Sequence, residues 1–590
     1  MLNLRKSPQS SSLVRIDDDP YRNEIIPAPC DVGLPEKFTK WRPWQYATVE
    51  RIIDDPHRFF VLCSPCGSGK SLSAMSCGVI SGLRTVLLTA TKGLQDQIGA
   101  DFTTIATDIR GMSNYRCPIA TKLSMPASTT VSEAPCTCGY KCALRFNGGC
   151  EYYDRYRRAQ SASAIVTNYQ CWFYDTLKEK SSLHIDPKLY EMKRELSGNN
   201  NDDPRKPVEL LVCDEADKIE FGELARFVGV DVSRRECLHL RIPWLDEGQT
   251  LEKWRHWAED CEKVIDARVK DAESKLASAR KGSGQEWSHD LRRLRDMKRK
   301  LSRLTTLKVE DDWILDEHTE RDSLSGATHL KAVRFTPLYP ARYAEQALWR
   351  GVKKIVLMSA TVRPETARFL GIDPGEMTFL EFPSSFDPKR RPVIQVPSVQ
   401  MNYRTEKDDR QMLWWLKKLD TIIGARQDRK GIIHAVSYAR AQFIRDNSEF
   451  GRFMLIHNSR DREEVIEKFR RSPAPAILVS PSVDTGYDFA GDQCRYAIIA
   501  KLPFASVKDK LVKARQERDK EYGLFLAAQT LVQMSGRPVR SESDWAEIII
   551  LDDSFSWFYP KVKKFLPRWW MDAVRKVDAP PPPLSPENLP

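Results

Sequence analysis

Five cysteines are concentrated in a short stretch of the chain, at Cys117, Cys136, Cys138, Cys142 and Cys150. The sequence holds 14 cysteines in 590 residues, and in a reducing compartment a local group of thiols indicates a metal site more often than disulfides. Thiolates are soft ligands that suit both zinc and iron–sulfur clusters, and the cysteine spacing does not separate the two. From the residues alone, zinc is the better interpretation.

A glycine-bearing loop with the spacing of a phosphate-binding site precedes these cysteines. Its sequence SPCGSGKS directly follows the apolar run RFFVLC (58–63), and a strand, a loop and a helix in that order let backbone N–H groups point at a phosphate. The two glycines let the backbone approach the phosphates, the lysine neutralises their charge, and the last hydroxyl can ligate Mg²⁺. A serine stands where the usual pattern has its first glycine. The predicted loop comprises Ser64, Pro65, Cys66, Gly67, Ser68, Gly69, Lys70 and Ser71.

A carboxylate pair lies beyond the cysteines, at the end of the apolar run VELLVC (208–213). In a phosphate-binding site Asp214 would hold Mg²⁺, directly or through water, and Glu215 would polarise the water that attacks the γ-phosphate. The alternative is that these carboxylates simply face solvent at a strand end. The presence of a phosphate-binding loop in the same chain favours the catalytic interpretation.

A third segment, QMSGRPVR, precedes the apolar run AEIIIL (546–551) and contains Gln533, Arg537 and Arg540. Arginines from a second lobe can reach the γ-phosphate, stabilise its charge in the transition state and make closure depend on nucleotide. Surface arginines are common, so the order of the three motifs carries this interpretation.

Length and composition limit the class of protein. A chain of 590 residues is too long for one hydrophobic core and predicts three or four domains. The net charge of +11 is modest for this length and favours a polyanionic partner only weakly, with a solvated surface as the alternative. No apolar run reaches the ~18 residues of a membrane span, and the N-terminus has no apolar signal core, so we expect a cytoplasmic protein.

Apolar runs alternate with helical patterns along most of the chain. Such runs predict parallel strands covered on both faces by helices, and hence an α/β fold with two doubly wound lobes. Residues 1–35 and the proline-rich tail 576–590 are expected to be disordered, with a further break at 197–207. The predicted strands are 58–63, 85–90, 164–169, 208–213, 354–359, 431–436, 476–480, 496–500 and 546–551.

Taken in order, SPCGSGKS, DEAD, SAT (359–361), SVDTGYD (482–488) and QMSGRPVR resemble the successive motifs of a superfamily 2 helicase. More narrowly they resemble the XPD/DinG family of iron–sulfur helicases. The compact form would suit a bacterial or phage-encoded member, and hence the cytosol of a bacterium or of a phage-infected host. The segments TATKGLQDQ, VTNY, RFTPLYP and SSFDP resemble further signatures of the family, so the likeness runs from about residue 42 to 553.

The resemblance implies a nucleotide site in which Gln45 reads adenine with Arg42 nearby, and to which Gly486 and Asp488 contribute. Asp217 departs from the histidine usual in the family, and Thr485 stands where many members have an acid. No N-terminal nuclease domain would fit before Arg42.

The resemblance also reverses the preference for zinc, because related helicases hold a 4Fe-4S cluster by four cysteines in this position. It implies Cys117, Cys136, Cys142 and Cys150 as ligands, with Cys138 as the alternative to Cys136. A metal would stiffen an insertion of roughly forty residues that is too small to form a core alone. Basic and aromatic residues around it could contact single-stranded DNA, although Tyr152 and Tyr153 could equally pack around the cluster.

A later insertion carries apolar residues every three or four positions in 251–279 and 287–304, which predicts a helical hairpin. Residues 251–308 hold sixteen basic and ten acidic residues, so this segment supplies +6 of the net charge. Its position resembles the arch domain of the family.

These interpretations predict an ATP-dependent DNA helicase that uses ATP, Mg²⁺ and a 4Fe-4S cluster on single-stranded or forked DNA. The resemblance implies 5′ to 3′ translocation, and we expect a monomer. A DNA-stimulated ATPase that remodels R-loops, RNA–DNA hybrids or protein–DNA complexes would share every motif, and a non-enzymatic zinc-stabilised module is the third alternative. The predicted domains are a first lobe at 36–115, 161–220 and 331–375, a cluster domain at 116–160, a helical arch at 221–330 and a second lobe at 376–575.

Overall fold

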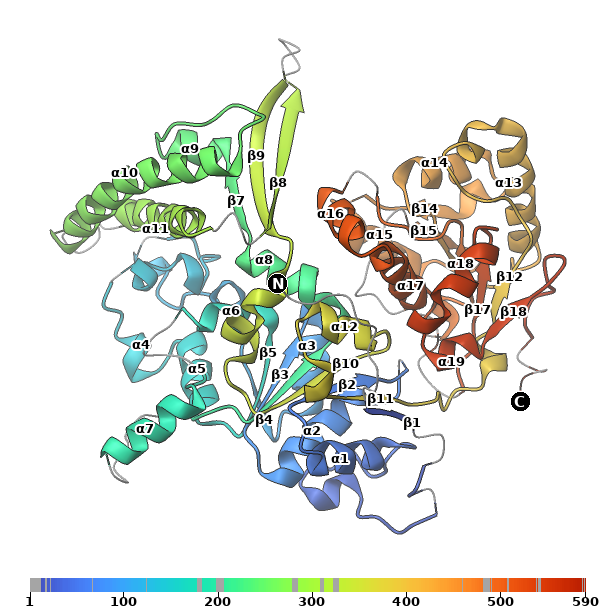
Figure 1. The fold of residues 1–590 in the computed structure, drawn as a ribbon, viewed down its shortest axis with the longest axis horizontal. Coiled ribbons are helices and arrows are strands. Elements are labelled where there is room, and N and C mark those ends of the chain that lie inside the picture. The colour runs from blue at the N-terminus through green and yellow to red at the C-terminus, as the bar shows by residue number, and fades with distance from the viewer. Residues whose placement is uncertain are drawn as a thin grey trace.

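Two parallel sheets, each covered by helices, form the body of the computed structural model (Figure 1). Each lobe is α/β and RecA-like, as the sequence predicts, because the fully apolar strands are buried on both faces. The structure describes residues 12–15, 19–21, 23–65, 67–123, 125–138, 140–177, 183–197, 206–278, 285–307, 312–321, 328–458, 460–480, 489, 491–506, 509–536, 539, 543–585, 587 and 589.

The first lobe contains an eight-stranded sheet in which the motif-bearing strands are neighbours. Its order is β1-β11-β2-β10-β6-β3-β5-β4, and all its pairings are parallel. Ser359 pairs with Cys63 and Met358 with Asp214, so three strands end level beside the phosphate-binding loop. Its strands are β1 Ser12–Arg15, β2 Phe59–Cys63, β3 Thr85–Thr89, β4 Ala106–Asp108, β5 Ala164–Asn168, β6 Leu210–Asp214, β10 Lys354–Ser359 and β11 Met377–Glu381.

The second lobe has a seven-stranded parallel sheet, in the order β14-β15-β13-β16-β17-β12-β18. Its strands are β12 Val393–Gln395, β13 Gly431–His434, β14 Met454–Ile456, β15 Ile477–Ser480, β16 Tyr496–Ile499, β17 Glu547–Ile550 and β18 Val574–Lys576. All nine predicted strand segments are therefore strands of these two sheets.

Helices surround both sheets and form most of the insertions. They are α1 Gln45–Asp54, α2 Lys70–Ser81, α3 Lys92–Asp101, α4 Leu144–Asn147, α5 Glu151–Ser161, α6 Tyr169–Asp175, α7 Pro187–Ser197, α8 Ala225–Val228, α9 Arg234–His239, α10 Leu251–Ser278, α11 Gln285–Thr305, α12 Pro364–Phe369, α13 Asp409–Gly424, α14 Tyr438–Asn447, α15 Arg462–Arg471, α16 Lys510–Arg518, α17 Tyr522–Ser535, α18 Phe555–Val562 and α19 Arg568–Met571.

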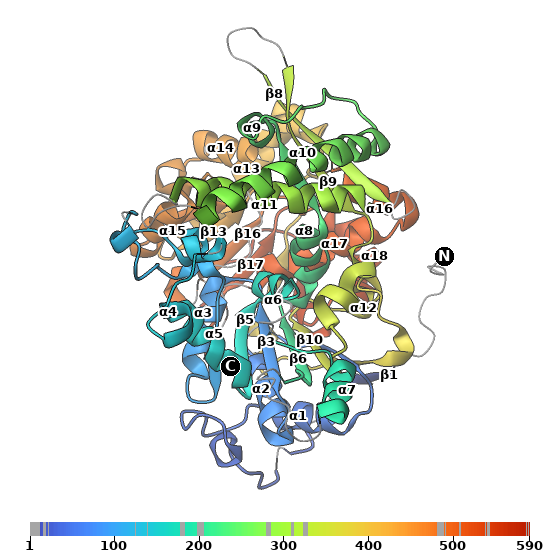
Figure 2. The same ribbon diagram turned by 90° about the vertical axis from the view of Figure 1, so that its left-hand side faces the viewer.

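The long insertion after the acidic motif contains the two predicted helices, α10 and α11. Their apolar faces meet in one core, which includes Trp254, Ile265 and Leu301. The predicted hairpin packs on a three-stranded antiparallel sheet that the sequence did not predict: β7 Val230–Ser233, β9 Thr328–Pro337 and β8 Trp313–Arg321. In both views α11 lies over the cysteine-bearing insertion, and Arg292 donates a hydrogen bond to the Ser132 carbonyl at 2.9 Å (Figures 1 and 2).

Both ends of the chain are more ordered than the sequence suggests. Residues 12–15 form β1 at the edge of the first sheet, so the expectation of disorder across 1–35 is wrong there. In the proline-rich tail, the carbonyls of Pro581 and Leu584 accept hydrogen bonds from Arg426 and Arg429. Prolines still supply carbonyl acceptors, and a buried guanidinium needs them. Most of the break at 197–207 lies outside the described residues.

Candidate active site

The phosphate-binding loop lies between β2 and α2, as its sequence predicts. Gly67 and Gly69 adopt left-handed backbone angles, with φ of 77° and 79°, and Gly69 is the N-cap of α2. Ser64, which replaces the usual glycine, fits because its N–H donates to the Ser359 carbonyl at 3.2 Å and its hydroxyl to that of Ser68 at 2.7 Å. Cys66 lies outside the described residues.

The lysine of this loop is folded back onto the loop itself. Lys70 Nζ donates to the carbonyls of Ser64 and Pro65, at 3.1 and 3.0 Å. Ser71 follows in the first turn of α2, half-buried. Phosphate oxygens placed at the helix N-terminus would offer this ammonium group stronger, charged acceptors than the two carbonyls.

The acidic pair closes β6 on the same edge of the sheet. Asp214 is buried, and burial raises the pKa of its carboxyl to about 6, against the opposing influence of Lys70. Glu215 has a left-handed φ of 51°, and its Oε1 pairs with Lys218 Nζ at 2.8 Å. Its Oε2 is buried without a hydrogen-bond partner, so this oxygen could accept a hydrogen bond from a water molecule.

The third predicted segment brings a residue of the second lobe to the acidic motif. Gln533, near the end of α17, donates its amide N–H to the Asp217 carboxylate and lies 3.5 Å from Thr361 Oγ1. Asp217, the departure from the expected histidine, is thus the partner of Gln533. Arg537, Arg540, Gly486 and Asp488 lie outside the described residues, so their roles stay predictions.

The residues predicted to read adenine line a hollow of about 390 Å³ beside this loop. The Gln45 amide donates to the carbonyls of Ser68 and Gly69, each at 3.1 Å, and its oxygen accepts the Arg42 N–H at 2.8 Å. The Arg42 guanidinium donates to the Gly67 carbonyl. Gln45 and Arg42 are therefore attached to the loop that would hold the phosphates.

Sequence reasoning missed one support of this hollow. Trp44 has a left-handed φ of 62°, and its backbone N–H donates a hydrogen bond to the Asp19 carboxylate at 3.0 Å. A non-glycine residue with positive φ needs such a support, and the acidic run DDDP was the only signal in the sequence.

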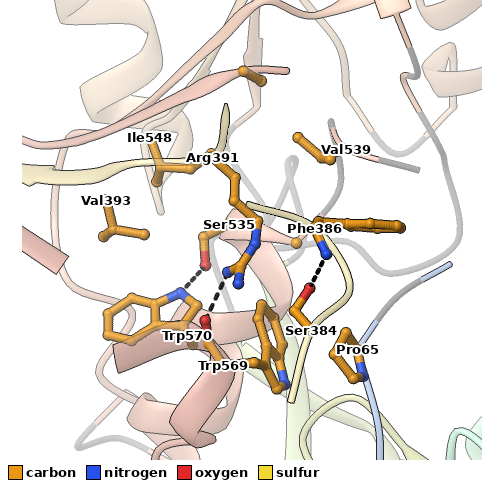
Figure 3. A pocket seen from close by; sticks show the side chains of 12 residues that line it. Pro65, Ser384, Phe386, Arg391, Val393, Ser535, Val539, Ile548, Trp569 and Trp570 are labelled. Atoms are coloured by element: carbon orange, nitrogen blue, oxygen red, sulfur yellow. Dashed lines mark hydrogen bonds between the residues drawn. The ribbon is translucent and has the colours of Figure 1, made fainter. Parts of the chain in front are cut away.

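A second hollow, of about 420 Å³, lies between the lobes beside residues 382–392, the linker that joins them (Figure 3). Pro65 of the phosphate-binding loop, the linker residue Phe386 and two tryptophans of the second lobe line it. Arg391 donates to the Trp569 carbonyl at 2.7 Å, and the Trp570 indole donates to Ser535 Oγ at 2.6 Å. Burial lowers the pKa of Arg391 to about 10.

The four cysteines implied as ligands line one cavity, of about 310 Å³. All four are buried, and the rest of the cavity wall is mostly apolar or aromatic. Burial raises the pKa of the Cys136 thiol to about 11, while the Tyr153 hydroxyl opposes that shift. Burial also raises the pKa of Cys150, which precedes α5, and the backbone N–H groups of Tyr153 and Tyr152 oppose that rise. The cavity is lined by Cys117, Cys136, Cys142 and Cys150.

Four buried thiols fit the donor set of a structural metal centre. Across the described part of the chain, however, no group of three or more His, Cys, Asp or Glu side chains is arranged to hold a metal ion. The side chain of Cys138 lies outside the described residues.

The aromatic residues around this cavity divide into two groups. Tyr115 and Tyr152 are buried in the core of the first lobe, so Tyr152 packs inside the protein and does not present its ring to nucleic acid. Phe146 and Tyr140 are 70% and 41% exposed, and the Arg145 guanidinium lies 5.6 Å from the Phe146 ring centroid. Only this second group could stack on nucleic-acid bases.

A phosphate-binding loop and an acidic pair follow strands of the first lobe that end level with one another, and a glutamine of the second lobe contacts the acidic motif. This arrangement, with both lobes parallel-stranded, defines a two-lobed α/β protein of RecA-like fold with a phosphate-binding loop in its first lobe. Among the described helices, none combines the length and the apolar character that crossing a membrane requires.

Comparisons with known proteins agree with this class. Residues 432–573 match the helicase C-terminal domain family. The chain is 23% identical over 243 residues to the ATP-dependent DNA helicase DinG of Photobacterium profundum (37% of this chain, 34% of the relative). It is 27% identical over 192 residues to the ATP-dependent DNA helicase YoaA of Escherichia coli (31% and 30%). The matches thus span about a third of these relatives.

Among solved structures, an XPD helicase superposes with a TM-score of 0.56 at 14% identity, covering 91% of this chain and 100% of that one. An apo XPD structure gives a TM-score of 0.50 at 14% identity, covering 90% and 99%. These likenesses confirm the fold. With the sequence matches, they show that the chain is similar to helicases of the DinG and XPD type, the resemblance that its motifs predict.

Proposed function

We propose that the protein is an ATP-dependent DNA helicase that translocates 5′ to 3′ on single-stranded DNA and opens forked duplexes. The contact between Gln533 and Asp217 carries the proposal, because it joins the second lobe to the acidic motif two residues after Glu215. A nucleotide in the cleft would therefore be sensed by both lobes. The relatives named as ATP-dependent DNA helicases support the same activity.

The residues of the cleft divide the work of hydrolysis. Lys70 would leave the carbonyls of Ser64 and Pro65 for the phosphates, where a charged acceptor replaces a neutral one. Ser71 and Asp214 would hold Mg²⁺, which neutralises charge on the phosphates. The unpartnered Oε2 of Glu215 would orient the attacking water, and Arg537 and Arg540 would stabilise the transition state.

The cavity lined by four cysteines is proposed to hold a 4Fe-4S cluster with Cys117, Cys136, Cys142 and Cys150 as ligands. The cluster would cross-link a segment that has little core of its own. The cysteine-bearing insertion is also supported by the arch, because Arg292 of α11 donates a hydrogen bond to the Ser132 carbonyl. The exposed Phe146 and the basic residues near it would contact the separated strand.

Hydrolysis of ATP by the full-length protein, with and without a single-stranded oligonucleotide, tests the proposal. The wild type is expected to hydrolyse ATP faster with DNA, and Lys70→Ala is expected to abolish hydrolysis while DNA binding, measured by fluorescence anisotropy, persists. Hydrolysis retained by Lys70→Ala would refute the assignment of the nucleotide site. Stimulated hydrolysis without strand displacement would favour an ATPase that remodels nucleic-acid complexes.

A further inference from the structure

A buried arginine of the second lobe is paired with an acid that follows the catalytic motif of the first. Arg515 lies on α16, and its guanidinium forms an ion pair with the Glu220 carboxylate. The two side chains are only 7% and 10% exposed. Glu220 lies in a single π-helical turn, Ile219–Leu224, which begins four residues after Glu215. Such turns interrupt regular helices and are frequent at functional sites.

Four aromatic rings surround the guanidinium of Arg515. Its central carbon lies 5.0 Å from the ring centroid of Phe221, 4.8 Å from Tyr339, 5.5 Å from Phe369 and 5.2 Å from Tyr522. Tyr522 begins α17 in the second lobe, whereas the other three rings belong to the first lobe and the chain returning to it from the arch. The cation is therefore removed from water at the boundary between the lobes, where its pairing with Glu220 is strengthened.

The acidic segment is thus held by the second lobe at two points. Gln533, at the end of α17, holds Asp217, while Arg515, packed on the first residue of α17, holds Glu220. Both points lie on the few residues that follow Glu215. Movement of α16 and α17 relative to the first lobe must therefore displace this segment or break both contacts.

We propose that Arg515 is a positioning residue for ATP hydrolysis: through Glu220 it transmits movements of the second lobe to Glu215, and so sets the rate of hydrolysis without contacting nucleotide. The inference rests on the proposed helicase function. It names a residue outside the motifs that carry that function.

The same helix supplies a matched control. Arg518 lies one turn further along α16 and pairs with Asp312 at 2.9 Å, near β8 at the base of the arch. Its side chain is 43% exposed and that of Asp312 is 36% exposed. A partly exposed pair contributes little, whereas removing one partner of a buried pair leaves an uncompensated charge.

The test is steady-state ATP hydrolysis by the full-length protein, saturated with a single-stranded oligonucleotide, for the wild type, Arg515→Met and Arg518→Met. Arg515→Met is expected to lower kcat about tenfold or more, with KM for ATP within about threefold of the wild type. Arg515→Lys, which keeps the charge, is expected to recover part of the loss. Arg518→Met is expected to match the wild type.

Glu220→Gln, of nearly equal volume, gives a second measure if Arg515→Met unfolds, and is expected to lower kcat in the same way. Binding of a fluorescent ATP analogue is expected to stay unchanged in both variants. Wild-type kcat in folded Arg515→Met or in Glu220→Gln would overturn the role of Arg515, as would a parallel loss of nucleotide binding. A wild type that hydrolyses no ATP would instead refute the proposed function.

Discussion

Substituting Gly69 by alanine should weaken ATP binding through Gln45, the residue predicted to read adenine. A Cβ at Gly69 would lie 2.2 Å from the Gln45 amide nitrogen, so the Gln45 side chain must move away. Its two hydrogen bonds to the loop carbonyls would be lost, at roughly 1 kcal/mol each. The left-handed φ of 79° adds a further cost of roughly 1–2 kcal/mol to folding.

Gly82→Ala separates these two effects. Gly82 ends the same helix with a φ of 65°, but a Cβ there would meet nothing within 4 Å. Both variants are expected to lose roughly 1–2 kcal/mol of unfolding free energy from backbone strain. Gly69→Ala is expected to lose roughly a further 2 kcal/mol of unfolding free energy with the two Gln45 hydrogen bonds, and it alone is expected to bind ATP more weakly, because Gln45 is displaced from its place beside the loop.

The assay is isothermal titration of ATP and GTP into each variant, with thermal unfolding measured in parallel. Gly69→Ala is expected to bind ATP more weakly and to discriminate less between ATP and GTP. Gln45→Ala should relieve the clash, so adding Gly69→Ala to it should cost less affinity than it does in the wild type. Equal affinity of Gly69→Ala and Gly82→Ala for ATP would refute the reasoning.

Three further predictions concern the metal, the lobe contact and pH. Cys142→Ser is expected to lose iron and to have a lower melting temperature, whereas Cys138→Ser is expected to keep the iron content and the melting temperature of the wild type. Visible absorption spectra with iron and zinc analysis measure the metal content. One zinc in colourless protein would contradict the cluster. Gln533→Ala is expected to lower kcat for ATP about tenfold or more, with ATP binding retained, because the contact to Asp217 is lost; unchanged kcat would contradict it. Burial lowers the pKa of His184 to about 4, so its neutral ring adds stability above pH 6.5 that is lost as the pH falls toward 4, by about 3 kcal/mol. Urea unfolding at pH 7 and pH 4.5 should therefore show a smaller pH effect in His184→Gln than in the wild type.

The sequence predicted the elements whose signal is local. Apolar runs such as 354–359 became buried strands, and the glycines of the phosphate-binding loop adopt the positive φ that the loop requires. The β7–β9 sheet was missed because β8, WILDEHTER, carries charged residues on a partly exposed ribbon and shows no apolar run.

Long-range contacts left no signal in the sequence. The pairing of β1 with β11 and the meeting of Arg515 with Glu220 depend on how distant segments pack. Gln45 was predicted to read adenine, yet its hydrogen bonds to the loop carbonyls follow from the placement of α1 beside α2. The four thiols were grouped by spacing and resemblance, and only the fold shows that they share one cavity.

Strand displacement on a forked duplex tests the central claim most directly. The wild type is expected to release a labelled strand from a fork with a 5′ single-stranded tail, only with ATP and Mg²⁺, and more slowly from one with a 3′ tail. Glu215→Gln, whose amide cannot activate the attacking water as a carboxylate does, is expected to bind the same fork without releasing the strand. Failure of the wild type to displace any strand while it hydrolyses ATP in response to DNA would contradict the account.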